Sequence, residues 1–346
     1  MGATDRAGSH DAGGPEPDAP ELEVRNLAPE EAGAFTMLIR RCYGDSYDQA
    51  WVYDADEIAR RLCDGTLHST VAVDGTDVVA QLALLRTSPT DDVAESGQAV
   101  VDPEYRGHHL FTELKRHAAE WASGAGLFGL YSEATAAHPF SQRANVALGA
   151  VETGVLVGYI PASVEYAAID ARSHRQSVVL YYLRTNAGHD RPVYAPPRDR
   201  DVVASILAAA QLRGALSGVP ARASLPARSD VHHERREDHD HLIVTARVVG
   251  DDLPTAVLAA REFAHDEGID CVYVDLPLAD PGTELVGDSV RDLGFAFGGV
   301  FPNKLHDCDV VRYQYLAGVE RDVRDISLAS EHGKDLLAYV LGVDRA

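Results

Sequence analysis

Long apolar runs and closely paired cysteines are both missing from this sequence of 346 residues. No apolar stretch approaches the roughly 20 residues of a membrane-spanning helix, and the polar N-terminus is unlike a signal peptide, so we expect a soluble, cytoplasmic protein. The cysteines lack both the C-x-x-C spacing of a zinc site and the density of a secreted disulfide scaffold. We therefore expect reduced, mostly buried thiols at Cys42, Cys63, Cys271 and Cys308.

Positive charge is also scarce. The formal net charge is −23, and lysine occurs only at Lys115, Lys304 and Lys334. Nucleic-acid binding normally requires a basic surface, so this balance argues against a nucleic-acid partner and favours cationic partners such as amines. No membrane partner is expected, and a homodimer stays open.

The chain is long enough for two domains of ordinary size. Residues 1–20 are rich in Gly, Pro and Asp, with little to bury, which predicts a disordered tail. After it, apolar periodicity predicts a strand, two helices and then three strands, the first two of which are joined by a turn at Asp74-Gly75. These elements are expected at 22–27, 29–44, 54–65, 69–87 and 95–101.

The segment QAVVDPEYRGHHLF, residues 98–111, carries the main functional signal. An apolar strand ends at Asp102-Pro103 and runs through Arg106-Gly107 into a helix expected to begin near His108. Backbone N–H groups at a helix N-terminus are unpaired and bind anions, and glycine lets the backbone come close to a ligand. The pattern predicts a cradle for the pyrophosphate of a cofactor.

The segment resembles motif A of the GNAT superfamily of N-acetyltransferases, an R/Q-x-x-G-x-G/A loop that binds acetyl-CoA. Arg106 fills the first position of this motif. His109 replaces its first Gly, and Phe111 replaces its final Gly or Ala. Downstream, a helix through Ser123, a strand at 127–138 and a motif B-like helix follow in the family's order. In that helix Ser141, Asn145, Leu148 and Gly149 match motif B, while its late tyrosine is missing.

The resemblance covers about residues 22–165 and implies acetyl-CoA as co-substrate, without a metal. The pyrophosphate would bind the loop, the backbone of Ala99 to Val101 would pair with pantetheine as an added strand, and Asn145 would contact the pantetheine arm. The implied cofactor-binding set is Ala99, Val100, Val101, Arg106, Gly107, His108, His109, Leu110, Phe111, Ser141 and Asn145.

From about residue 172 a second series of strands and helices is expected. From residue 241 onward their order repeats the layout of residues 95–168, and LGFAFGGVFPN looks like LGAVETGVLVGYIP. This second half lacks the Arg/Gln-x-x-Gly signature, so we expect it to be structural or to shape the acceptor pocket. The resemblance implies an α/β (α+β) protein of two GNAT-like domains, each a mixed, mostly antiparallel sheet flanked by helices. The expected domains are 21–168, which binds acetyl-CoA, and 169–346, a degenerate copy.

Acetyl transfer needs a base that accepts a proton from an ammonium group. Glu95 is the first candidate, because an acidic residue at the matching place is the base in protein-acetylating members of the superfamily. Strand alternation puts it on one face with Gly97, Ala99 and Val101, and a solvated carboxylate at a strand end is the alternative. Glu133 is the second candidate, since its strand is unusually polar for a central one.

Tyr131 and Tyr159 are candidates to protonate the departing thiolate, or are simply core aromatics. His108 and His109 could donate hydrogen bonds to a phosphate, or could face solvent while backbone amides bind it. The histidines between 232 and 241 fit no standard metal spacing, and a solvated loop or edge is the favoured interpretation there.

We therefore expect an acyl-CoA-dependent N-acyltransferase that moves acetyl directly to a primary amine of a small molecule. A non-catalytic acyl-CoA sensor is the alternative from another class, because the motif B tyrosine is absent and the loop is altered. A protein amine as acceptor also stays open, whereas the acidic charge speaks against an aminoacyl-tRNA donor.

Overall fold

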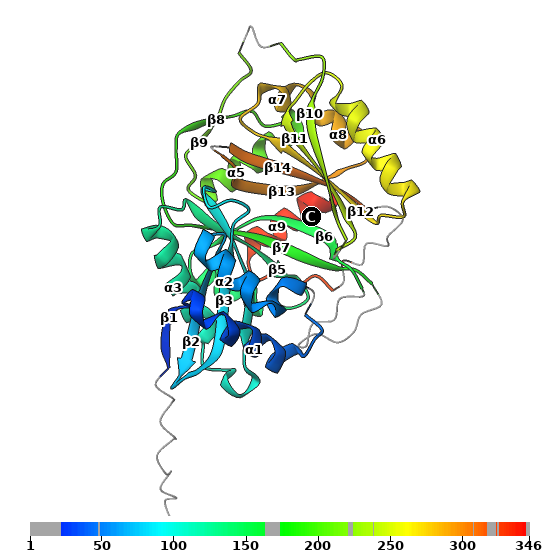
Figure 1. The fold of residues 1–346 in the computed structure, drawn as a ribbon. Coiled ribbons are helices and arrows are strands. Elements are labelled where there is room, and N and C mark those ends of the chain that lie inside the picture. The colour runs from blue at the N-terminus through cyan, green and yellow to red at the C-terminus, as the bar shows by residue number, and fades with distance from the viewer. Residues whose placement is uncertain are drawn as a thin grey trace, which may run out of the picture.

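The computed structural model describes residues 22–47, 49–162, 174–220, 224–237, 239–306, 308–316, 323 and 325–343. The tail predicted at residues 1–20 and the domain boundary expected at residue 168 lie outside these ranges. The described part has an N-terminal half and a C-terminal half stacked along one continuous sheet (Figure 1). No helix within it is long and apolar enough to cross a membrane.

The N-terminal half contributes one side of the sheet. Its neighbouring strands are antiparallel except β4 and β5, which run parallel. Across the sheet the strands follow in the order β1 (Glu23–Asn26), β2 (Leu67–Asp74), β3 (Asp77–Leu85), β4 (Val93–Val101), β5 (Gly129–Thr135), β7 (Gln176–Arg184) and β6 (Val151–Ile160).

Helices cover both faces of this half, because alternate residues of the strands are apolar on each side. Phe35, Leu38 and Ile39 pack on one face with Val71 and Val73 of β2, while Leu110, Leu114 and Ala118 pack on the other with Ala72. The first face carries α1 (Ala32–Tyr43) and α2 (Ala55–Asp64), and the second carries α3 (Leu110–Gly124), with α4 (Phe140–Ala147) beyond β5.

The strand β7 lies between β5 and β6 and hydrogen-bonds to both. The sequence predicts this segment, residues 176–185, as the first strand of the second domain, because an apolar, alternating segment does not reveal which strands it will join. The structure instead uses β7 to complete the N-terminal part of the sheet. In the sheet, β7 thus belongs with the strands of the N-terminal half.

The C-terminal half repeats the second part of this arrangement. Its strands β11 and β12 are parallel, like β4 and β5, and β14 lies between β12 and β13, as β7 lies between β5 and β6. Its elements are β10 (Asp230–Arg236), β11 (His241–Val248), α6 (Leu253–Asp266), β12 (Cys271–Pro277), α7 (Pro281–Val286), α8 (Asp288–Asp292), β13 (Ala296–Leu305), β14 (Cys308–Leu316) and α9 (Glu331–Leu341).

The halves meet where β6 pairs with β13, at the register pair Gly154 and Gly299. These glycines occupy equivalent places in the repeated segments LGAVETGV and LGFAFGGV. A Cβ added to Gly154 would lie 2.2 Å from the carbonyl oxygen of Gly298. The two strands can cross this closely only because neither residue has a side chain.

The segment between the halves is partly helical. It contains β8 (Arg191–Val193), α5 (Arg200–Ala209) and β9 (Gly214–Leu216), and β8 and β9 form a separate small sheet. Among the cysteines, Cys271 and Cys308 are buried, whereas Cys42 is half-buried and Cys63 is exposed. All four are free thiols, but the expectation of mostly buried cysteines is wrong at Cys63.

Candidate active site

The strands β4 and β5 separate in the middle of the N-terminal half. They pair only from Val93 to Glu95, opposite Gly129 to Tyr131, and no pairing between them continues beyond that point in the described strands. A bulge in β4, with φ of 42° at Gln98 and a register shift against β3, turns the rest of the strand. The opening leaves one edge of β4 without a neighbouring strand.

A groove of about 660 Å³ occupies this opening. Ala99 and Val101 of β4 form one wall, and Glu133 and Thr135 of β5 form another. The unpaired edge of β4 is suited to bind an extended chain by strand addition. The N-terminus of α3 and the start of α4 complete the lining with Tyr43, Tyr105, Arg106, Gly107, His109, Leu110, Phe111, Thr112, His138, Phe140, Ser141, Ala144 and Ile160.

The loop at the N-terminus of α3 forms one end of the groove. Gly107 and His109 have φ of 89° and 58°, so His109 adopts the left-handed conformation that glycine takes easily. Within the described chain, no residue accepts a hydrogen bond from the backbone N–H groups of residues 107–111. These N–H groups and the positive end of α3 suit a phosphorylated ligand.

The predicted binding residues differ in whether their side chains line the groove. The Phe111 side chain lines it and narrows it, at a position where the family has Gly or Ala. The exposed His108 is absent from the lining, and the side chain of Val100 is buried in the core under α1. Val100 can therefore contribute only its backbone to binding, whereas the His108 side chain faces solvent.

Asn145 does not reach the groove. Its side chain is buried, donates a hydrogen bond to the Ser141 carbonyl oxygen at 3.1 Å, and accepts one from Lys115. Lys115 also donates to Ser132 at 2.7 Å. Burial lowers the pKa of this lysine to about 7. The predicted contact between Asn145 and a pantetheine arm therefore needs a different rotamer of a side chain that is already paired.

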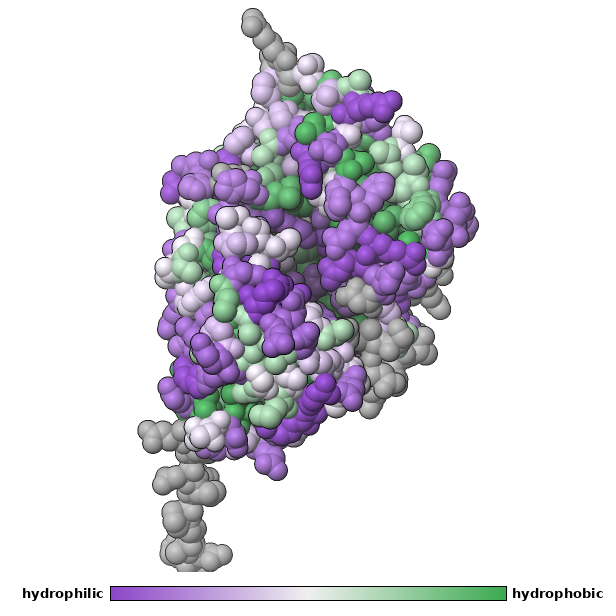
Figure 2. All heavy atoms as spheres, viewed as in Figure 1, coloured by the Kyte–Doolittle hydropathy of each residue, from purple (hydrophilic) through white to green (hydrophobic). Residues whose placement is uncertain are grey.

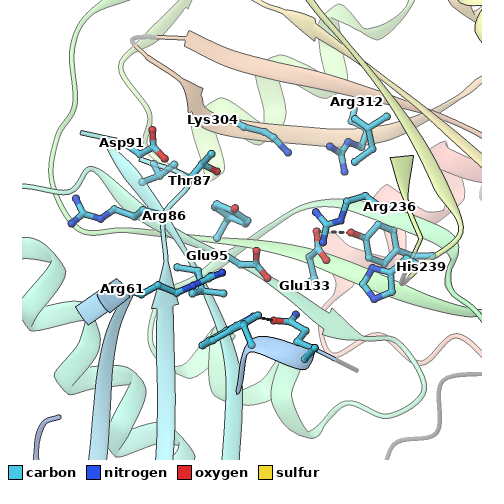
Figure 3. A pocket seen from close by; sticks show the side chains of 18 residues that line it. Arg61, Arg86, Thr87, Asp91, Glu95, Glu133, Arg236, His239, Lys304 and Arg312 are labelled. Atoms are coloured by element: carbon cyan, nitrogen blue, oxygen red, sulfur yellow. Dashed lines mark hydrogen bonds between the residues drawn. The ribbon is translucent and has the colours of Figure 1, made fainter. Parts of the chain in front are cut away.

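A second cavity of about 570 Å³ lies between the two halves. Figure 2 shows a hollow there with hydrophilic residues at its borders, and Figure 3 shows its charged lining. Glu133 lines both this cavity and the groove, so the two spaces adjoin at this residue. The remaining lining is Gln49, Ala50, Trp51, Arg61, Leu85, Arg86, Thr87, Asp91, Val93, Glu95, Tyr131, Tyr159, Arg236, His239, Ile243, Lys304 and Arg312.

Glu95 points into this second cavity from β4 (Figure 3). Burial, and next the negative charge of Glu133, raise the pKa of Glu95 to about 7. A carboxylate with this pKa can exist in both protonation states near neutral pH and can exchange a proton with an amine.

The two tyrosines lie beside these carboxylates. The Tyr159 hydroxyl donates a hydrogen bond to Oε1 of Glu133 at 3.3 Å, and Tyr131 is paired in register with Glu95. Burial raises the pKa of both tyrosines well above 10, so each holds its proton. The structure thus brings together Glu95, Glu133, Tyr131 and Tyr159 at one cavity.

Sequence reasoning did not find the cationic residues of the opposite wall. Lys304 of β13 and Arg312 of β14 point from the C-terminal half toward the carboxylates (Figure 3). Arg312 is buried and donates two hydrogen bonds of 2.7 Å to Asp275 of β12. A signal for them was present in the sequence: Asp275, Lys304 and Arg312 are charged residues in strands whose apolar pattern predicts burial.

The histidines near β10 lie in different surroundings. His232 and His233 lie on β10, an exposed edge strand, while His239 lines the second cavity and His241 is buried on β11. No group of three or more potential ligands among His, Cys, Asp and Glu comes together in the described part of the chain.

Comparisons with known proteins cover part of the chain. Residues 33–144 match the model of the acetyltransferase (GNAT) family. This match spans β2 to β5, the separated strands and the loop before α3. Residues 33–144 thus form a GNAT acetyltransferase domain. The comparison with curated proteins gave no match.

Several solved structures resemble about half of the chain. A GNAT-family acetyltransferase from Streptococcus pneumoniae is 14% identical, with a TM-score of 0.39 over 47% of this chain and 99% of that one. The ribosomal-protein-S5-alanine acetyltransferase from Vibrio fischeri is 14% identical, with a TM-score of 0.39 over 49% and 96%. The spermidine/spermine N-acetyltransferase from Vibrio cholerae is 20% identical, with a TM-score of 0.37 over 47% and 92%.

Proposed function

We propose that the protein transfers an acetyl group from acetyl-CoA directly to a primary amine of a small molecule. The observation that carries this proposal is the position of Glu133, which lines both the groove at motif A and the cavity between the halves. A donor in the groove and an acceptor in the cavity would then meet at one carboxylate. The lining of the cavity by residues of both halves favours a small acceptor over a folded protein.

The groove residues fit a CoA ester. The N–H groups of residues 107–111 and Arg106 would hold its pyrophosphate, and the open edge of β4 at Ala99 to Val101 would align the pantetheine arm. Bound there, the thioester supplies the activated acyl group. Ser141 and Phe111 would line the arm and set its position.

Proton transfer falls to the residues of the second cavity. Glu95 accepts a proton from the ammonium form of the acceptor, so that its nitrogen can form the new bond to the acetyl carbon. The bond from that carbon to sulfur breaks, the thiolate takes up a proton from a neighbouring hydroxyl, and the second proton that the nitrogen releases restores this hydroxyl. Tyr159 is the preferred proton donor, because its hydroxyl already donates to the shared residue Glu133.

The proposal is tested by mixing the protein with acetyl-CoA, a thiol indicator and a panel of small primary amines. Amine-dependent release of CoA is the expected result. Calorimetric binding of acetyl-CoA without release of CoA by any amine would support a sensor instead. An intact-mass survey of proteins incubated with the protein and acetyl-CoA would reveal a protein acceptor.

A further inference from the structure

The two walls of the cavity between the halves differ in charge. The charged residues of the C-terminal wall are cations, whereas the N-terminal wall carries Arg61 and Arg86 as well as its carboxylates. Glu95 and Glu133 come from strands of the N-terminal half, whereas Arg236, Lys304 and Arg312 come from strands of the C-terminal half. Figure 3 shows Lys304 and Arg312 on the side opposite the two carboxylates. An acceptor in this space therefore meets both negative and positive side chains.

Two cations of the C-terminal wall, Lys304 and Arg312, have the single carboxylate of Asp275 as their nearest negative partner. Both carboxylate oxygens of Asp275 accept hydrogen bonds from Arg312 at 2.7 Å. The Lys304 ammonium lies 3.8 Å from Oδ2 of the same Asp275, which is longer than a hydrogen bond. Two cations thus share one carboxylate, and the second cation is not directly hydrogen-bonded to it.

Lys304 is held in place and still reaches the cavity. Its ammonium lies 4.3 Å from the centre of the Phe301 ring, and its side chain is 31% exposed. A smaller hollow of about 250 Å³ also borders Lys304, and its other lining residues are Thr90, Asp91, Asp92, Asn303 and His306. Burial lowers the pKa of Lys304, and an anion beside it would favour the charged form.

We propose that Lys304, supported by Arg312, forms an anion subsite, and that the acceptor is an amine that also carries a carboxylate or a phosphate. This inference rests on the proposed acetyl transfer. The amine lies toward Glu95 and Glu133, and the anionic group lies toward Lys304. An acceptor with cations at both ends would place one of them against Lys304 and Arg312, where it is repelled.

Matched pairs of amines test the subsite. Phosphoethanolamine against ethanolamine tests a phosphate, and phenylalanine against phenethylamine tests a carboxylate. The wild-type protein should prefer the anionic member of at least one pair by about 10- to 100-fold in kcat/KM, the range expected for a charge-assisted hydrogen bond. Equal or better use of both neutral amines would overturn the subsite while leaving the acetyl transfer intact.

Variants assign the preference to one side chain. Lys304→Met should reduce it to within about 3-fold of unity, and Lys304→Arg should retain most of it, because both cations bind anions. Lys334→Met is the matched control, since Lys334 is an exposed lysine on α9 that pairs with Glu331. It should behave as the wild type. A Lys304→Met protein that unfolds at the wild-type temperature yet keeps the full preference contradicts the proposal.

A binding measurement separates the two proposals if no amine releases CoA. Calorimetric titration with phosphoethanolamine, ethanolamine, phenylalanine and phenethylamine needs no turnover. Tighter binding of an anionic member, lost in Lys304→Met, supports the subsite even though the acetyl transfer has failed. Binding of the anionic members no tighter than that of the neutral ones overturns it.

Discussion

Tyr159 on β6 donates a hydrogen bond of 3.3 Å to Oε1 of Glu133 on β5, and it does so across β7, which lies between these two strands in the sheet. The bond joins the carboxylate shared by the groove and the cavity to a strand at the junction of the halves. Burial raises the pKa of Tyr159 well above 10, so the hydroxyl remains a donor at neutral pH.

Replacing this hydroxyl should slow the reaction. We expect Tyr159→Phe to lower kcat by roughly 10- to 100-fold, because loss of a positioned proton donor removes general acid catalysis, while the Kd of acetyl-CoA stays near the wild-type value. Steady-state kinetics with calorimetric binding will show this. Tyr131→Phe is the comparison, and a larger loss there would transfer the role to Tyr131.

Glu95→Gln should remove the base. The expected loss in kcat/KM for the amine is about 10²-fold or more, with little change in the affinity for acetyl-CoA. Unchanged turnover would exclude Glu95 from the mechanism.

The same variant has a signature in the pH profile. Glu95 accepts a proton only when it is ionised, so the wild-type rate should rise as the pH is raised through about 7 and then level off. The remaining activity of Glu95→Gln should not show this rise near pH 7. If the variant kept the same rise in rate, the titrating group would be a residue other than Glu95.

Arg106 should contribute to affinity rather than to the chemical step. Its Nε donates to the Val101 carbonyl oxygen at 3.3 Å, and its side chain lines the groove. Arg106→Ala should raise the Kd of acetyl-CoA by roughly 10-fold, as expected for loss of one charge-assisted contact to a phosphate. Arg106→Gln should lose less, because its amide still donates. Calorimetry should reveal the order, and equal Kd values for all three proteins would contradict the cradle.

The junction of the halves should not tolerate a side chain at Gly154. A Cβ there would lie 2.2 Å from the Gly298 carbonyl oxygen and 2.5 Å from Cα of Gly299, and both atoms belong to the backbone. Gly154→Ala should lower the free energy of unfolding by about 2 kcal/mol or more, as overpacked cores do. Urea denaturation is the measurement.

Gly33→Ala is the matched control for that substitution. Gly33 lies in α1, and nothing lies within 4 Å of the added Cβ. Alanine there should change stability little or raise it by up to about 1 kcal/mol, because it favours the helix. Equal behaviour of the two variants would show that the contact between β6 and β13 is looser than the structure indicates.

Local patterns in the sequence predicted most of the elements and the motif A loop. Asp54, for example, caps α2 through hydrogen bonds from the N–H groups of Asp56 and Glu57, and Gly65 ends it in the left-handed conformation. The repeat of β4 to β6 in β11 to β13 was also visible. Alternation in β4 predicted one face for Glu95, Ala99 and Val101, and this is wrong: Glu95 lies opposite Leu85 on the α1 side of the sheet, whereas the bulge at Gln98 turns Ala99 and Val101 to the α3 side.

The arrangements that were missed depend on contacts between distant segments. The apolar pattern of β7 is compatible with either half, and only pairing with β5 and β6 fixes its place. Asn145 matched motif B, but a buried Lys115 on another helix holds its side chain away from the groove. The cationic wall arises from Lys304, which faces Glu95 only after the sheet has brought the halves together.

The most direct test of the account is the mass balance of a single reaction. The wild-type protein is incubated with acetyl-CoA and an amine that releases CoA, and both products are quantified in the same sample by mass spectrometry. The account predicts one N-acetylated amine for each CoA released, with both products reduced together in Glu95→Gln. Release of CoA without acetylated amine, or binding of acetyl-CoA with neither product, would contradict it.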